Sequence, residues 1–293
     1  MQNILSSATP TLEWRNPDFK ERLKMLAGAL IFPRVTRRWL LQLASVPVLR
    51  SLAARDPRMR YQIYRPYLSS HLSVGARADA IAGHYCLLHE LGWGRAALLS
   101  SGAAILAARF AGRTDAAFEV RLSTAHVNER EGEQALQLVS GGRVIYTASF
   151  TLGLEGARRQ LTIGSLQGLR AADGEDCMRE ATRELHGMRP SNFMMALLRD
   201  LAAALACDDV VLVSNRNRIV VNYRRRKRIC FDYDGLAGEL GGARNAGGNF
   251  TLAPRNVEAQ DQSEVRSSKR AAFRRRITLI ADVRTQILQT VAG

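Results

Sequence analysis

The sequence predicts an α+β protein in which a mixed α/β sheet follows a helical N-terminal part. Apolar residues recur at helical spacing in the first third of the chain, and strict alternation replaces this pattern after Gly112. A second helical stretch and a continuous apolar run, Val210–Ser214, come later. Strands followed by helices are typical of this fold class. We therefore expect a basic helical part over residues 1–111 and a sheet domain with a C-terminal helix over residues 112–293, packed as one unit.

The N-terminal part is predicted to contain two basic helices. The first covers Asp18–Phe32 and ends at Pro33, and the second covers Thr36–Ala53 with a break near Pro47. Arginines flank the apolar residues of the second helix, so it either lies on anionic lipid or packs its apolar side on the rest of the protein. The arginines are Arg34, Arg37, Arg38, Arg50 and Arg55, and the apolar residues are Trp39, Leu40, Leu41, Leu43, Val46 and Leu49. Three further elements are expected here: extended chain over Arg58–Leu68, a helix over Val74–Leu91 and a buried helix over Ala96–Ala108.

Alternating apolar and polar residues after Gly112 predict an antiparallel meander of about four strands. Gly141-Gly142 fits a tight hairpin turn within it, because both glycines can adopt positive φ. The expected strands cover Phe118–His126, the region around Leu136 and Leu138, Val144–Phe150 and Arg159–Leu166.

The remaining segments alternate between helical and extended patterns. Acidic residues suit the start of the next helix, and its end carries a glycine that can serve as a cap. The expected elements are a helix from Asp173–Asp176 to Gly187, a helix from Pro190 to Leu205, a buried strand over Val210–Ser214, a strand over Arg228–Tyr233, a glycine-rich loop over Gly235–Asn249, a short strand over Phe250–Leu252 and a long basic helix over Ser263–Thr290.

The charge of the chain points to anionic partners. Lys and Arg number 42 against 27 Asp and Glu, which gives a formal net charge of +15. An anionic membrane surface, a phosphorylated small molecule or nucleic acid would all attract such a protein. Nucleic acid is the least favoured of the three, because no nucleic-acid-binding motif accompanies the charge.

Membrane spans and metal sites are not predicted. The most apolar run, Ala96–Ala108, is well short of the ~20 residues that cross a bilayer. Without an export signal, the expected location is the cytoplasm, peripheral to the inner membrane if the basic surface meets lipid. The spacing of the cysteines and histidines matches no metal-binding motif, so we expect no metal-binding residues.

The best candidate for phosphate binding is the segment Ile163–Arg170, where a strand leads through a glycine-containing loop to a helix. Free backbone N–H groups at a helix start attract phosphate. Gln167, Gly168 and Arg170 are therefore candidate cofactor-binding residues. An ordinary turn between a strand and a helix would have the same sequence.

A second candidate site follows the central strand, because ligands of α/β sheets favour the carboxyl ends of strands. Asn215 and Arg218 lie there and offer polar and cationic groups. The basic run Tyr223–Arg228 comes next, followed by Asp232 and Asp234. This arrangement either forms a salt-bridged hairpin or places a carboxylate as a general base in a basic pocket. The candidate catalytic residues are Asp232, Asp234, Tyr223 and the isolated His186.

An ordered set of short motifs resembles the VirK/YbjX family of bacterial proteins, a family with a domain of unknown function. The motifs are Arg65-Pro66-Tyr67-Leu68, His84-Tyr85, Arg130-Glu131-Gly132-Glu133, Ile163-Gly164-Ser165-Leu166-Gln167-Gly168, His186-Gly187-Met188-Arg189-Pro190, Ser214-Asn215, Asp232-Tyr233-Asp234, Glu239-Leu240-Gly241-Gly242 and Ser268-Lys269-Arg270 with Arg274–Arg276. The resemblance implies a role in virulence, in the display of surface proteins and in resistance to antimicrobial peptides. It implies membrane association and envelope proteins as partners, and it supplies no catalytic residues.

The predicted element order is also similar to the acyl-CoA N-acyltransferase architecture. In that fold a loop after the fourth strand holds the pyrophosphate of acyl-CoA, and Gln167–Arg170 stands at the matching place. Asn215 and Tyr223 resemble a later Asn and Tyr of the fold. The glycine spacing of its phosphate loop is absent, because Gly174 comes too late after Gln167. The resemblance implies an acyltransferase as the alternative function, on fold-level analogy alone.

Overall fold

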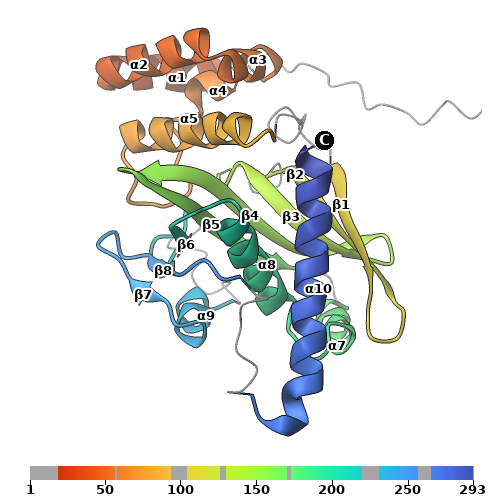
Figure 1. Cartoon of the computed structure of the whole chain (residues 1–293). Coiled ribbons are helices and arrows are strands. Elements are labelled where there is room, and N and C mark those ends of the chain that lie inside the picture. Colours follow the sequence, from red (N-terminus) through yellow and green to blue (C-terminus); the bar gives the residue numbers. More distant parts are fainter. Residues whose placement is uncertain are drawn as a thin grey trace, which may run out of the picture.

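The computed structural model describes residues 19–56, 58–93, 104–125, 130–169, 173–219, 231–256 and 265–292. An eight-stranded mixed sheet lies between two sets of helices (Figure 1). The helices are α1 (Phe19–Ile31), α2 (Pro33–Ser45), α3 (Pro47–Arg55), α4 (Met59–Gln62), α5 (Val74–Glu90), α7 (Gly174–Glu184), α8 (Pro190–Ala204), α9 (Tyr233–Glu239) and α10 (Ser267–Ala292). The strands are β1 (Ala104–Ala111), β2 (Ala117–Thr124), β3 (Gln134–Ser140), β4 (Arg143–Glu155), β5 (Arg158–Gly168), β6 (Asp209–Leu212), β7 (Ala243–Arg244) and β8 (Phe250–Leu252). The predicted α+β class is confirmed.

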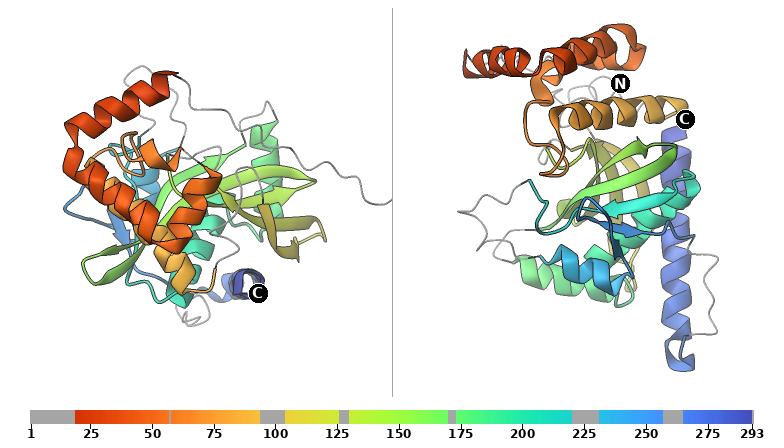
Figure 2. Two further views of the ribbon diagram at one scale, coloured as in Figure 1. Left: turned by 90° about the horizontal axis from the view of Figure 1, so that it is seen from above. Right: turned by 90° about the vertical axis from the view of Figure 1, so that its left-hand side faces the viewer.

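The N-terminal helices form two tiers on one side of the sheet. Helix α5 lies next to β4, and α1, α2 and α3 lie beyond it, farthest from the sheet (Figures 1 and 2). The two basic helices and the break at Pro47 are confirmed. The extended chain expected over Arg58–Leu68 is wrong at its start, where α4 makes one helical turn. Burial of Met59 and Tyr61 and a hydrogen bond from Trp39 Nε1 to the Met59 carbonyl (3.1 Å) fix this turn.

The sheet has the strand order β1-β2-β3-β4-β5-β6-β8-β7. Strands β1 to β5 are antiparallel neighbours, β5 and β6 are parallel, and β6, β8 and β7 are antiparallel. The predicted meander is thus confirmed, with one more strand than expected. Gly141 and Gly142 have φ of +56° and +76° and form the predicted turn between β3 and β4.

The extra strand, β1, corrects the helix predicted over Ala96–Ala108. Within that range, residues 104–108 belong to the strand, and residues 96–103 lie outside the described residues. The alanines favour a helix by local propensity, but pairing with β2 overrides that preference. Ala107 and Ala108 are buried, and α10 lies close to this strand. The sheet therefore begins within the part, residues 1–111, that was predicted to be helical.

Helices α7, α8 and α10 lie on the other side of the sheet (Figure 1). The predicted α7–α8 pair, the buried β6 and the long basic α10 are confirmed. The strand expected over Arg228–Tyr233 is wrong at its end, because α9 begins at Tyr233, and residues 228–230 lie outside the described residues. The loop expected over Gly235–Asn249 likewise contains most of α9 and the short β7. No helix in the described part of the chain is long and apolar enough to cross a membrane.

Candidate functional site

The most connected polar site lies where β5 and β6 part. These parallel strands pair as far as Ile163 and Leu212, and in the described structure β5 then continues beside β4 only. The buried ring of Tyr233 lies at the edge that β6 leaves. Its hydroxyl accepts a hydrogen bond from the Leu166 N–H at 2.6 Å and donates one to the Leu166 carbonyl at 3.0 Å. One side chain therefore takes the place of the strand partner that β6 no longer provides.

Asn215 holds the start of α9 against the end of β6. Its Nδ2 donates to Asp232 Oδ1 at 2.6 Å, its Oδ1 accepts from the Tyr233 N–H at 3.1 Å, and its backbone N–H donates to Asp234 Oδ1 at 2.8 Å. A backbone N–H in the first turn of α9 and the Asn215 amide hold the pKa of Asp232 below its usual value. Asp234 also pairs with Arg244 at 2.9 Å. Both carboxylates thus have structural partners, and a role as general base stays a prediction.

Arg218 belongs to the same cluster. Its guanidinium carbon lies 4.0 Å from the centre of the Tyr233 ring, a cation–π contact. The side chain is buried, and its Nε has no hydrogen-bond partner within the described part of the chain. The structure thus joins Asn215, Arg218, Asp232 and Asp234 around Tyr233. Tyr223, the other candidate of this region, lies outside the described residues. We call Asn215, Arg218, Asp232, Tyr233 and Asp234 together the Tyr233 junction.

An amide network that the sequence pattern did not predict ties the junction to the N-terminal part. Asn217 Nδ2 donates to the Gly247 carbonyl at 2.7 Å and to Asn249 Oδ1 at 2.9 Å. The Ser214 N–H donates to the same Asn249 oxygen at 3.2 Å, and the Ser70 N–H donates to the Asn217 carbonyl at 2.8 Å. In the sequence, the network is indicated only by two asparagines: Asn217, which follows the central strand, and Asn249, which precedes the last strand. These bonds fix the loops on either side of β6.

The predicted phosphate loop lies at the end of β5. Gln167 Nε2 donates to Glu131 Oε2 at 3.0 Å, so its amide already has a partner from within the chain. Gly168 is the last residue of β5, and Arg170 lies outside the described residues. The first turn of α7 carries acidic side chains, and the preceding Asp173 pairs with Arg143 at 2.7 Å. These carboxylates disfavour an anion at this helix start. Phosphate binding here stays a prediction.

A buried glutamate joins the N-terminal helices to the sheet, and sequence reasoning did not single it out as a titrating group. Glu133 accepts hydrogen bonds from the Tyr85 hydroxyl at 2.5 Å and from Gln62 Nε2 at 3.0 Å. Burial raises its pKa to about 7, against the opposing effect of these hydrogen bonds. The neighbouring Gly132 lies so close to β4 that a Cβ there would be 2.7 Å from the Phe150 nitrogen. The position of Glu133 in a short Glu-Gly-Glu segment was the available signal.

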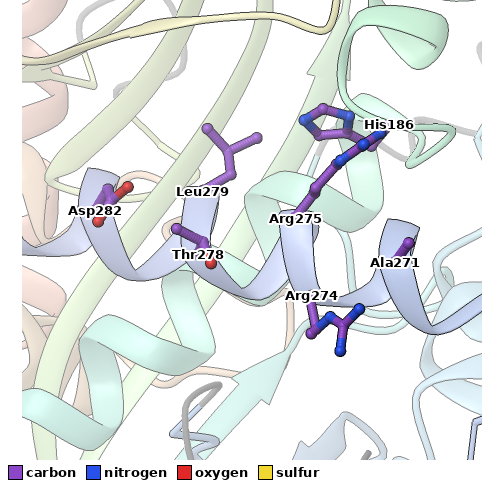
Figure 3. Close-up of a pocket in the computed structure, with 7 residues that line it drawn as sticks. All are labelled: His186, Ala271, Arg274, Arg275, Thr278, Leu279 and Asp282. Carbon is purple, nitrogen blue, oxygen red and sulfur yellow. The ribbon is translucent and has the colours of Figure 1, made fainter.

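His186 lies against α10 and not in the Tyr233 junction. Its ring lines a groove of about 440 Å³ beside α10. Figure 3 shows the ring close to Arg275, while Arg274 points to the other side of the helix. The His186 carbonyl accepts hydrogen bonds from Arg276 Nε (3.0 Å) and Nη2 (2.7 Å). Partial burial, followed by the charges of Arg275 and Arg276, lowers the pKa of His186. A catalytic role for this histidine stays a prediction.

The outermost N-terminal helices expose an apolar surface. Of the ten large apolar side chains that are exposed among the described residues, seven lie on or between α1 and α2. They are Leu23, Leu26, Leu30, Ile31, Phe32, Leu40 and Leu41, and we call them the leucine face. Trp39, Leu43 and Leu49 are instead buried in the core, so for these residues the packing alternative is confirmed. For the exposed side of the same segment, contact with anionic lipid stays a prediction.

The fold and the junction define a class of protein: an α+β protein with a mixed sheet whose only parallel pair, among the described strands, parts around a buried tyrosine. No solved structure is significantly similar to this chain. The chain belongs to the family described as "Protein of unknown function (DUF535)", whose model matches residues 15–289. This match confirms the family resemblance that the motifs indicated.

The relatives of the chain are uncharacterized bacterial proteins. "Uncharacterized protein YbjX" of Escherichia coli (strain K12) is 27% identical over 285 residues, which is 96% of this chain and 86% of the relative. An uncharacterized protein of Haemophilus influenzae is 27% identical over 171 residues, which is 57% of this chain and 56% of the relative. Their names assign no activity.

Proposed function

We propose that this protein is a membrane-peripheral bacterial accessory protein that docks on an anionic membrane through its leucine face. The observation that carries the proposal is the outward direction of the α1 leucines. Leu30 is 81% exposed and Leu26 is 59% exposed. Scattered apolar side chains are normal on a protein surface, but here seven of the ten exposed large apolar side chains of the described residues lie on or between two successive helices, and such gathering marks an interaction site.

The packing of α1 explains why its leucines face outward. Gly28 lies on the ring of Tyr64, where a Cβ would be 2.6 Å from a ring carbon. Leu23, Leu26 and Leu30 follow the spacing i, i+3 and i+7, so they share one stripe of the helix. Leu26 and Leu30 are each two residues from Gly28, which is a rotation of about 200° around the helix axis. The leucine stripe therefore lies on the side of α1 opposite the Tyr64 contact. The inner side of α1 is used for packing, and the outer side is left for a partner.

Basic side chains complete the surface. Arg34, Arg37 and Leu41 follow the same spacing along α2, opposite the buried Trp39, and all three are exposed. Each basic residue near an anionic membrane contributes about 1 kcal/mol of attraction. Full burial of a leucine side chain contributes about 1.5–3 kcal/mol. An apolar stripe with arginines beside it is typical of helices that lie in the plane of a membrane interface.

The biological role that fits such docking is support of the cell envelope. The family resemblance implies correct display of surface proteins, envelope integrity or resistance to antimicrobial peptides. A protein held at the cytoplasmic face of the inner membrane, with envelope proteins as partners, could serve each of these. In a strain that lacks the gene, we expect the wild-type protein to restore peptide resistance and a Leu26→Glu/Leu30→Glu variant to fail at equal abundance.

Vesicle co-sedimentation tests the docking itself. We expect the full chain to bind phosphatidylglycerol-containing vesicles at low salt and to bind pure phosphatidylcholine vesicles weakly. The Leu26→Glu/Leu30→Glu variant should lower the partition coefficient by about 100-fold, because two apolar contacts are lost. Leu154→Glu is the matched control, since Leu154 is also 59% exposed but lies on β4. Equal binding by the variant and the wild type would refute the proposal.

An acyl-CoA-dependent acyltransferase is the second candidate. The specific observation in its favour is the parallel β5–β6 pair that parts after Ile163 and Leu212, followed by the β7–β8 hairpin. This resembles the acyltransferase architecture, in which Gln167, Gly168 and Arg170 would hold the cofactor and Asn215 and Arg218 would lie nearby. Millimolar acyl-CoA should then raise the melting temperature, and an unchanged melting temperature would rule this candidate out.

A further inference from the structure

A second basic feature lies on the opposite side of the sheet from the leucine face. Helices α8 and α10 and the end of α9 enclose a cleft of about 380 Å³, within the size range of ligand pockets. Four arginines line it: Arg189, Arg199, Arg255 and Arg276. Glu239 is the one acidic residue among those that line the cleft. We call this feature the arginine cleft.

One wall of the cleft is apolar because of the residue spacing on α10. Phe273, Ile277 and Ile280 stand at positions i, i+4 and i+7 of the helix, so they form one stripe, with Arg276 beside it. Helix α8 presents the small Ala196 to the same space. A small residue across from large ones leaves room between the helices, and the cleft therefore has an apolar wall and cationic groups together.

Backbone carbonyl groups hold two of the four guanidinium groups in place, those of Arg199 and Arg276. Arg199 Nε donates to the Ala253 carbonyl at 2.9 Å, and Arg276 donates through two nitrogens to the His186 carbonyl. None of the four arginines forms an ion pair with an acidic side chain in the residues that the structure describes. Burial, followed by the charge of Arg255, lowers the pKa of Arg199.

Another arginine of α10 does have an acidic partner. Arg284, also on α10, lies 3.3 Å from the fully buried Asp200 of α8. Two turns along the same helix, Arg276 has a carbonyl partner and, among the described residues, no ion pair with a carboxylate. Arg199 is the buried arginine of the cleft, and a buried cation without a counter-charge costs free energy unless a ligand supplies the negative charge.

We propose that the arginine cleft binds an amphipathic phosphate, a single alkyl or acyl chain that ends in a phosphate group. The phosphate contacts Arg199 and Arg255, whose planar guanidinium groups match its oxygens, with Arg189 at the rim. The chain lies along Phe273, Ile277 and Ile280. This binding site is separate from the leucine face, and it does not depend on membrane docking.

Calorimetric titration of the full chain with decyl phosphate, below its micelle concentration, tests the proposal. We expect saturable binding, and roughly fourfold tighter binding for each methylene added between octyl and decyl phosphate, because the chain is buried on the apolar wall. Inorganic phosphate should bind at least tenfold more weakly than decyl phosphate. Absence of saturable decyl phosphate binding, or equal affinity for inorganic phosphate, would overturn the proposal.

Matched variants locate the site. Arg255→Ala should weaken decyl phosphate binding about tenfold and Arg189→Ala/Arg255→Ala further, as expected when cationic contacts are removed. Arg274→Ala removes the same charge from the residue next to Phe273 and should change the affinity less than twofold, because this side chain is absent from the cleft lining. Equal loss in Arg255→Ala and Arg274→Ala would overturn the proposal.

Two further variants test whether decyl phosphate binds in this cleft. Arg255→Lys keeps the charge but loses the planar guanidinium group, so its affinity should fall between those of the wild type and Arg255→Ala, and it provides a folded variant if the alanine variant does not fold. The Leu26→Glu/Leu30→Glu protein should bind decyl phosphate as tightly as the wild type. Loss of binding in that variant would place the alkyl chain on the leucine face and would overturn the cleft assignment, whatever the vesicle result.

Discussion

The polar side chains of the Tyr233 junction have hydrogen-bond partners within the fold, whereas the apolar side chains of the leucine face are exposed. At the junction, Asn215 supplies partners to Asp232, to the Tyr233 backbone and to Asp234. On the leucine face, apolar side chains point away from the protein although buried positions exist nearby. The comparison indicates that the polar residues of the junction stabilise the fold, whereas the exposed apolar residues of the leucine face do not pack within it. The partner should therefore be sought at the surface.

The largest expected effect tests the structural side of this contrast. Tyr233→Ala should lower the free energy of unfolding by about 3–5 kcal/mol, because a fully buried aromatic ring leaves a cavity. Tyr233→Phe should cost about 1–3 kcal/mol, because the Leu166 N–H and carbonyl lose their partner. Urea unfolding measures both. Tyr233→Phe with wild-type stability would show that the hydroxyl bonds do not hold the junction.

A somewhat smaller effect should appear in the pH dependence of stability. Burial raises the pKa of Glu133 from its ordinary value of 4.5 to about 7 in the folded state. The folded state therefore holds a proton that the unfolded state releases between these values, and this group makes stability fall as pH rises from 4.5 to 7. The full contribution is about 3 kcal/mol.

His84 works in the opposite direction, so the measurement must be a difference. Burial lowers the pKa of His84 to about 3, and this makes stability fall as pH decreases from 6.5. The difference in unfolding free energy between Glu133→Gln and the wild type cancels this term. We expect the variant to gain relative stability as pH rises to 7 and no further above it. A difference that does not change with pH would contradict a buried, titrating Glu133.

Two glycine substitutions make the smallest and most local test, and they sharpen the account of α1. Gly28→Ala should destabilise the protein by about 1–3 kcal/mol, because the new Cβ would meet the Tyr64 ring at 2.6 Å. Gly83→Ala in α5 has its nearest described atom at 4.0 Å and should stabilise the helix by up to about 1 kcal/mol. Thermal unfolding of the pair checks the signs. A stabilising Gly28→Ala would show that α1 does not pack through Gly28.

Sequence periodicity was sufficient for most helices and strands but not for β1, α4, α9 or β7. An alanine-rich run has helical propensity, and only pairing with β2 under α10 makes it a strand. Tyr233 lies in a segment with the composition of a strand, but a helix begins there, where the Tyr233 N–H donates to Asn215 Oδ1. Local patterns cannot reveal partners that lie far away in the chain.

The same limit applied to the candidate sites. Sequence reasoning selected Asn215, Arg218, Asp232 and Asp234 for chemical reasons, and the structure brings them together around Tyr233. It could not foresee that Asn215 and Arg244 would already pair with the carboxylates. The basic helices were recognised from their arginines, but the exposed leucines of α1 depend on which side faces Tyr64, and that is a tertiary contact.

The most direct test of the docking proposal is the binding of purified protein to phosphatidylglycerol vesicles at low salt. We expect the wild type and Leu154→Glu to co-sediment equally. Leu26→Glu/Leu30→Glu should have a partition coefficient about 100-fold lower at an unchanged melting temperature. If all three proteins sediment alike, the leucine face is not the membrane contact and the central claim is wrong.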